Sequence, residues 1–144
     1  MIQVSVVRLD PELALPAYAR AGDAGIDLVA RHGALVPAAG GRVLMPTGIA
    51  IAVPDGHAGL LLPRSGLALR HGLTLANSPG LIDAGYRDEL KVALLNTDPE
   101  HDYEVCRGDR IAQLMILPVP AIEWVELASF EGEHRGGGFG HTGR

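Results

Sequence analysis

A chain of 144 residues with a net charge of −5 fits one domain and argues against general binding to nucleic acid or to a membrane surface. Hydrophobic residues make up 47% but aromatic residues only 4%, so the core must be aliphatic. The single cysteine, Cys106, excludes an internal disulfide and fits a reducing compartment. No apolar run reaches the length of a membrane span and no signal-peptide pattern is present, so we expect a cytoplasmic domain.

The nineteen glycines and ten prolines predict frequent turns, and therefore short strands rather than long helices. Apolar and β-branched runs between the turns predict strands at 2–9, 26–30, 41–54, 58–62, 73–76, 90–96, 103–106, 111–117 and 122–127. A Pro-Thr-Gly interruption at 46–48 makes 41–54 either one bulged strand or two strands. The runs 73–76 and 90–96 are expected to pair as a hairpin with a long loop, and 107–109 to form a turn.

Only residues 66–70 have a helical pattern, with Ser65 as the candidate N-cap and Gly72 as the residue that ends the helix. Many short strands with one short helix predict an all-β fold, namely a sandwich, a jelly roll or a distorted β-barrel. From residue 131 onward the chain is rich in glycine and polar residues and cannot build a core. We therefore expect one domain over 1–130, followed by a glycine-rich mobile tail over 131–144.

The segment 77–90 carries the densest group of unusual residues in the chain. Gly80 and Gly85 permit positive φ and close approach by a ligand, and Asp83 and Tyr86 lie on the same bend. A turn alone does not need an amide, a proline, two glycines, a carboxylate and a phenol together. The surplus indicates a binding site for a flat polar ligand with a carboxylate beside it.

Two further segments suggest contacts to phosphate. Arg64, Ser65 and Gly66 precede a short helix, whose unpaired amides and partial positive charge attract phosphate. Taken alone, this segment is explained more simply as an ordinary N-cap beside a solvated arginine. Gln113 lies in an otherwise apolar run, where it is either a buried amide with partners or an edge-strand side chain that faces water.

A third polar segment and the tail leave similar alternatives open. Asp27 lies between two apolar residues and either orients an arginine or a metal-bound water, or simply faces solvent, which is the simpler interpretation. In the tail, glycines around Arg135 can cradle phosphate and Phe139 can stack on a base, although a flexible tail explains the glycines as well. The six histidines have no metal-ligand spacing, so a zinc site is not expected.

In their chain order and spacing, these five segments resemble those of the trimeric dUTP diphosphatases (dUTPases), and the resemblance spans residues 21–143. The resemblance implies a jelly-roll homotrimer with three active sites at subunit interfaces, each completed by another subunit's C-terminal tail. It implies hydrolysis of dUTP to dUMP and diphosphate with Mg²⁺ as cofactor. That reaction keeps uracil out of DNA and supplies dUMP for thymidylate synthesis.

The resemblance also assigns roles to individual residues. Asp83 is the implied general base that activates water, and Tyr86 packs under the deoxyribose and leaves no room for a 2′-hydroxyl. Asp27 supports the metal and phosphate region without holding the ion directly, because Mg²⁺ is bound mainly by the substrate's phosphates. The implied catalytic set is Asp83, Asp27, Arg64 and Gln113.

The remaining implied roles concern substrate binding. The uracil edge is read by Asn77 and by the backbone of Gly80, Leu81, Ile82 and Asp83, with Lys91 nearby. The phosphates are held by Arg64, Ser65, Gly66 and Gln113. In the tail, the terminal phosphate meets Arg135, and the uracil is covered by Phe139 and the adjoining Gly140.

Two departures from the family pattern stand out. The spacing from Arg135 to Phe139 is one residue shorter than usual, and Asp88 stands where the family usually has glycine. A related enzyme class, the dCTP deaminases, shares the fold but needs a glutamate-based site, and the stretch 66–68 fits the diphosphatase better. A nucleotide-binding jelly roll without turnover is the non-enzymatic alternative.

Overall fold

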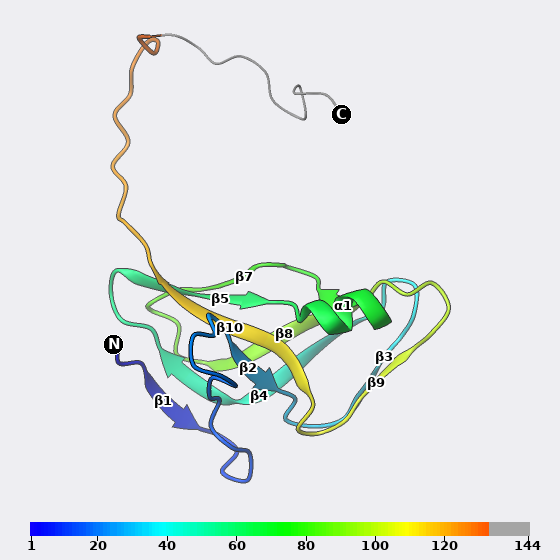
Figure 1. Ribbon diagram of the computed structural model, residues 1–144. Coiled ribbons are helices and arrows are strands. Elements are labelled where there is room, and N and C mark those ends of the chain that lie inside the picture. The colour runs from blue at the N-terminus through cyan, green and yellow to red at the C-terminus, as the bar shows by residue number, and fades with distance from the viewer. Residues whose placement is uncertain (133–144) are drawn as a thin grey trace.

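The computed structural model describes residues 1–132, and within them it contains ten strands and one helix (Figure 1). In chain order these are β1 (Ser5–Arg8), β2 (Ile26–Val29), β3 (Ala34–Val36), β4 (Arg42–Ala52), β5 (His57–Leu62), α1 (Ser65–His71), β6 (Leu73–Leu75), β7 (Gly80–Ile82), β8 (Glu89–Asn96), β9 (Tyr103–Val105) and β10 (Arg110–Pro118). The predicted all-β class with a single short helix is confirmed. No helix in the part of the chain that the structure describes is long and apolar enough to span a membrane.

Two four-stranded antiparallel sheets build the body of the fold, with strand orders β1-β4-β8-β6 and β2-β10-β5-β7. A two-stranded ribbon of β3 and β9 completes the described sheets, and they do not close into a barrel. Alternate residues of both large sheets point into one buried cluster, as along β8, where Leu90, Val92 and Leu94 are buried. The fully buried hydrophobic side chains are aliphatic, as the composition predicted.

The interruption at Pro46 produces one bulged strand rather than two. β4 runs unbroken from Arg42 to Ala52, and its pairing with β8 shifts register between Pro46 and Ala50. At the bulge, the hydroxyl of Thr47 donates a hydrogen bond to the carbonyl of Leu90 at 2.8 Å, and Gly48 adopts a φ of 78°. The bulge therefore fixes the start of β8.

The segment between β6 and β8 differs from the simple loop that the sequence suggested. The predicted pairing of the flanking runs is confirmed, because Leu73–Leu75 pairs with β8. Between them, however, the chain crosses to the other sheet and forms β7 beside β5, with Gly80 opposite Leu61. A Cβ on Gly80 would lie 3.2 Å from the Leu61 Cβ, so glycine is what permits this close pairing.

Two predictions are wrong: the N-cap of the helix and the strand at 122–127. The helix begins at Ser65, with Arg64 as its N-cap and no side-chain cap, whereas Gly72 ends it as expected with a φ of 63°. The predicted strand at 122–127 is not formed: this segment leaves the body after β10 (Figure 1), and no strand within 1–132 pairs with it. Its apolar side chains are exposed, to 89% in Trp124.

Candidate active site

Four polar side chains meet at one end of the second sheet, and we call them the Asp27 cluster: Asp27, Arg64, Arg110 and Gln113. Asp27 on β2 pairs directly with Gln113 on β10, and Gln113 pairs in turn with Leu62 at the end of β5. Arg64 follows two residues after Leu62, just before α1. The antiparallel register thus brings together residues that are distant in sequence.

The Asp27 carboxylate is the centre of this cluster. Its Oδ1 lies 3.2 Å from Nε of Arg64 and accepts a hydrogen bond from Nε2 of Gln113 at 3.4 Å. Its Oδ2 lies 3.4 Å from Nη1 of Arg110. The side chain is only 16% exposed, so the solvent-facing interpretation of Asp27 is wrong, and the one in which it orients an arginine is confirmed. Gln113 is half-buried with a partner rather than facing water.

Arg110 is the site residue that the sequence did not reveal. It follows the 107–109 turn and contacts Asp27, and its carbonyl accepts a hydrogen bond from Nη1 of Arg64 at 3.0 Å. A β-bulge between Arg110 and Ala112 shifts the register of β10 against β2. Nothing in the sequence marks that bulge, so the only available signal was proximity to Gln113.

Ser65 and Gly66 open α1 beside this cluster. Ser65 is exposed, and a Cβ on Gly66 would lie 2.9 Å from Nη2 of Arg70. Glycine at 66 therefore leaves room for a guanidinium on the same helix. The two residues lie next to Arg64, as the phosphate hypothesis requires.

The second group of predicted residues lies on the bend, which we define as residues 77–86. Asp83 follows β7 directly and is exposed, and its carbonyl accepts a hydrogen bond from the amide of Tyr86 at 3.1 Å. The phenol of Tyr86 donates to the carbonyl of Glu89 at 2.9 Å. Burial raises the pKa of Tyr86, and the negative charges of Asp88 and Glu89 raise it further, so the phenol stays a neutral donor near pH 7.

The other predicted residues of the bend divide by exposure. Asn77 is exposed, and its Nδ2 lies 3.2 Å from the position a Cβ would take on Gly80. Leu81 is exposed while Ile82 is buried in the core, so Ile82 can offer a ligand only its backbone. Lys91 is exposed on β8 and pairs with Pro46 of β4. It therefore lies in the first sheet, whereas Gly80 to Ile82 form β7 in the second sheet.

The Asp27 cluster and Asp83 do not meet within one chain. By register, Asp83 is opposite Ala58 on β5, whereas Asp27 is in the row of Leu62, four residues away. At about 3.3 Å per residue and about 4.8 Å between strands, the offset is roughly 13 Å along the sheet and roughly 14 Å across its three strand spacings. The two Cα atoms are therefore roughly 19 Å apart. The predicted tail residues Arg135, Phe139 and Gly140 lie outside the described residues.

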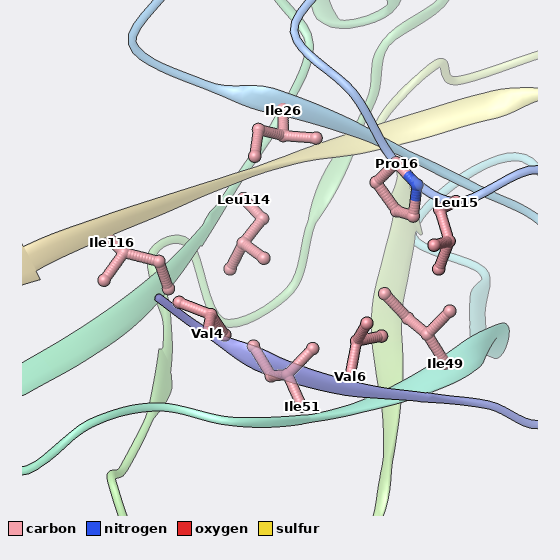
Figure 2. A pocket seen from close by; sticks show the side chains of 9 residues that line it. All are labelled: Val4, Val6, Leu15, Pro16, Ile26, Ile49, Ile51, Leu114 and Ile116. Carbon is pink, nitrogen blue, oxygen red and sulfur yellow. The ribbon is translucent and has the colours of Figure 1, made fainter. Parts of the chain in front are cut away.

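An apolar pocket of about 170 Å³ lies elsewhere, between the two large sheets (Figure 2). It is lined by Val4, Val6, Leu15, Pro16, Ile26, Ile49, Ile51, Leu114 and Ile116. None of these side chains carries a polar group that could orient a nucleotide. The pocket is therefore not the candidate active site.

Comparison with known proteins identifies the family. The family model described as dUTPase matches residues 12–143. The chain belongs to the dUTPase family. Its relatives include the deoxyuridine 5′-triphosphate nucleotidohydrolase of Thermobifida fusca, 55% identical over 99% of this chain and 79% of the relative. The enzyme of the same name from Mycobacterium marinum is 56% identical over 89% of this chain and 82% of its own length.

A solved structure agrees with the fold. The dUTPase of Staphylococcus bacteriophage 80alpha, solved with dUPNHPP, superposes with a TM-score of 0.85, covers 99% of both chains and is 24% identical. At that identity the likeness supports the fold alone, and it confirms the predicted dUTPase architecture. The family match and the two close relatives confirm the predicted activity: this dUTPase hydrolyses dUTP.

Proposed function

We propose that each active site of this dUTPase combines the Asp27 cluster of one copy of the chain with the bend of another. The observation that carries this proposal is the separation of roughly 19 Å between Asp27 and Asp83 in one chain, estimated from strand geometry. A general base must lie within hydrogen-bond reach of the proton it takes, directly or through one water. A second copy supplies what one chain holds too far away, and a homotrimer with three interfacial sites meets this need.

At such a site, Asp83 is the general base. Its carboxylate is exposed at the end of a paired strand, and the hydrogen bond from the Tyr86 amide to its carbonyl restrains its backbone. It takes a proton from water as the water oxygen bonds to the α-phosphorus, and the bond from that phosphorus to the oxygen bridging the α- and β-phosphates breaks, so that diphosphate leaves. The products are dUMP and diphosphate. Positioned bases of this kind contribute roughly 10²–10⁴-fold to the rate.

The bend selects the nucleoside. Asn77 and the backbone from Gly80 to Asp83 face the uracil edge, and Tyr86 lies under the deoxyribose. Cytosine presents the wrong pattern of donors and acceptors, and the methyl group of thymine collides with the backbone of the bend. Sites built to satisfy specific polar groups reject wrong partners by roughly 10⁴-fold, which apolar contacts alone do not achieve.

The Asp27 cluster binds the phosphates together with Ser65 and Gly66. Arg64 has five N–H donors, and its known contacts occupy Nε with Asp27 and Nη1 with the Arg110 carbonyl. Asp27 therefore orients the guanidinium and leaves donors for phosphate oxygens. Arg110 adds a second positive charge to the same carboxylate and joins the phosphate-binding group.

Mg²⁺ fits this arrangement as an ion carried mainly by the substrate. Residues 1–132 contain no group of three His, Cys, Asp or Glu side chains that could hold a metal. Both oxygens of Asp27 already contact Arg64, Arg110 or Gln113. Asp27 therefore supports the metal and phosphate region without binding the ion directly. Mg²⁺ accepts phosphate oxygens and retained waters as ligands. When bound, it neutralises charge on the phosphate chain.

Three further elements complete the proposal. The domain over 1–130 forms the site, and the tail over 131–144 closes it, with Arg135 at the terminal phosphate and Phe139 and Gly140 over the uracil. Closure excludes bulk water from the ligand, apart from the water that Asp83 activates. The single cysteine is consistent with a reducing, cytoplasmic location.

Release of diphosphate from dUTP, dCTP, dTTP and UTP, each with Mg²⁺, tests the selectivity. We expect rapid release from dUTP only. Ammonia from dCTP would support the deaminase alternative, and nucleotide binding without diphosphate would support the non-enzymatic one. Light scattering tests the trimer: a monomer that retains full turnover would contradict the interfacial site.

A further inference from the structure

Glu89 links the bend to an ion pair that the reaction itself does not use. It is the first residue of β8, and its side chain is only 15% exposed. Its Oε1 accepts a hydrogen bond from the amide of Gly48 at 2.8 Å. Nη1 of Arg31 lies 3.2 Å from Oε1 and 3.3 Å from Oε2, so one guanidinium nitrogen bridges both carboxylate oxygens. The carboxylate thereby ties β8 to the bulge of β4.

The main chain of the same residue holds Tyr86. The carbonyl of Glu89 accepts the phenolic hydrogen bond of Tyr86 at 2.9 Å. Tyr86 also packs against the hydrophobic core, and its amide donates to the carbonyl of Asp83 at 3.1 Å, but the Glu89 carbonyl is the acceptor that its phenol meets. A shift of Glu89 would therefore move the acceptor that fixes the tyrosine ring.

Arg31 is itself held from three directions. Its Nη2 donates to the carbonyl of Leu9 at 3.0 Å, and its Nε lies 3.5 Å from Oδ2 of Asp10. Its amide donates to the carbonyl of Pro46 at 2.9 Å. These contacts restrain the guanidinium between the N-terminal segment and the β4 bulge, and the Arg31 side chain is 35% exposed. An ion pair with fixed ends can set the position of a strand start.

We propose that the Arg31–Glu89 ion pair positions Tyr86 and so determines how strongly the enzyme prefers deoxyribose over ribose. This inference rests on the proposed place of Tyr86 under the sugar. Exclusion of a 2′-hydroxyl depends on the distance between ring and sugar, and misplacement by about 1 Å can cost on the order of 100-fold in a catalytic site. Arg31 and Glu89 act through Tyr86 and are positioning residues.

The test compares kcat/KM for dUTP and for UTP in the intact enzyme with Mg²⁺. Glu89→Gln keeps the size of the side chain and its acceptor oxygen, but it loses the charge that holds Arg31. Arg31→Lys keeps the charge but loses the planar guanidinium. We expect Glu89→Gln to lower the dUTP-to-UTP ratio about tenfold, chiefly by raising UTP turnover, and Arg31→Lys to lower it less.

Arg107→Ala is the matched control for loss of stability. Arg107 contacts Asp10 and Glu12 and donates to the Arg31 carbonyl, but it does not touch Glu89. We expect this variant to lower Tm while the dUTP-to-UTP ratio stays at the wild-type value. An equal drop in the ratio for Arg107→Ala and Glu89→Gln would overturn the inference, because it would mean that general loosening explains both.

A double-mutant cycle with Tyr86→Phe locates the path of the effect. Because that substitution removes the hydroxyl that meets the Glu89 carbonyl, adding Glu89→Gln should then change the ratio less than about twofold. Full additivity would overturn the inference, as would an unchanged ratio in Glu89→Gln alone. A wild-type enzyme that turns over both nucleotides equally would instead refute the role of Tyr86 in the proposed function.

Discussion

The Asp27 cluster and the bend are built in different ways. In the cluster, two guanidinium groups and one amide, from the segment before α1 and from β10, converge on the Asp27 carboxylate, which is largely shielded from water. On the bend, Asp83 and Leu81 are exposed, and the restraints are mainly backbone hydrogen bonds and one phenol. The cluster is suited to holding charge in a fixed place, whereas the bend is suited to shape recognition and proton transfer. Substitutions in the two regions should therefore change different kinetic parameters: kcat for the bend and KM for the cluster.

Asp83→Asn should give the largest loss. The amide has nearly the shape of the carboxylate but cannot take a proton from water, so we expect kcat to fall by roughly 10²–10⁴-fold. Affinity for dUTP should remain within a few-fold of wild type, because the phosphate-binding cluster is untouched. Single-turnover kinetics and calorimetric titration measure the two quantities separately.

Asp88→Asn is the matched control for that variant. Asp88 is an exposed carboxylate near Asp83, and it has no role in the proposed chemistry. Near-normal turnover is expected, so the loss in Asp83→Asn cannot be ascribed to charge alone. Near-wild-type hydrolysis by Asp83→Asn would refute the assignment of the base.

Mixing two inactive variants tests whether the bend and the Asp27 cluster of one site come from different copies of the chain. Asp83→Asn damages only the bend, and Arg64→Ala damages only the Asp27 cluster. If each site draws its bend and its cluster from different copies, random assembly from equal amounts leaves about one quarter of the sites intact. Co-expression with two affinity tags and purification of the mixed trimers removes the inactive homotrimers, so about one third of wild-type activity should be recovered. No recovery in confirmed mixed oligomers would place the whole site within one chain.

Arg64→Lys should have a smaller effect. Lysine keeps the positive charge but cannot hold Asp27 and the Arg110 carbonyl at once through a planar fork. We expect KM for dUTP to rise about tenfold, with a smaller change in kcat, since a charge-assisted contact is worth about 1.5 kcal/mol. Arg42→Lys, an exposed arginine on β4, is the control. An equal rise in KM for both would argue against a specific role for Arg64.

The sequence predicted the strands that have strong apolar patterns and missed those that depend on a partner. β7 is three residues flanked by turn formers, and its strand geometry comes from pairing with β5. The opposite error occurred at 122–127, where an apolar pattern predicts a strand, but no partner within 1–132 accepts its backbone hydrogen bonds. Local pattern gives propensity, and pairing decides the outcome.

The candidate site shows the same division. For Asp27 and Gln113 the sequence left two interpretations open, and the contact that decides between them joins residues 86 positions apart. Only the register of β2 against β10 supplies that information. Ser65 failed as an N-cap because the helix includes it, which shows that a common capping residue does not fix a helix boundary.

The smallest effect concerns Asp10, which has ion pairs like Asp27 but no place in the site. A hydrogen bond from Arg107 holds the pKa of Asp10 at about 2, below its ordinary 3.8, although partial burial opposes this. Because the folded-state pKa is the lower one, the stabilisation is complete above about pH 4 and is lost as pH falls toward 2. Asp10→Asn should therefore lower the urea midpoint at pH 7, and its deficit should shrink between pH 4 and pH 2. A deficit that is constant with pH would mean that packing, rather than the Asp10 charge, provides the stabilisation.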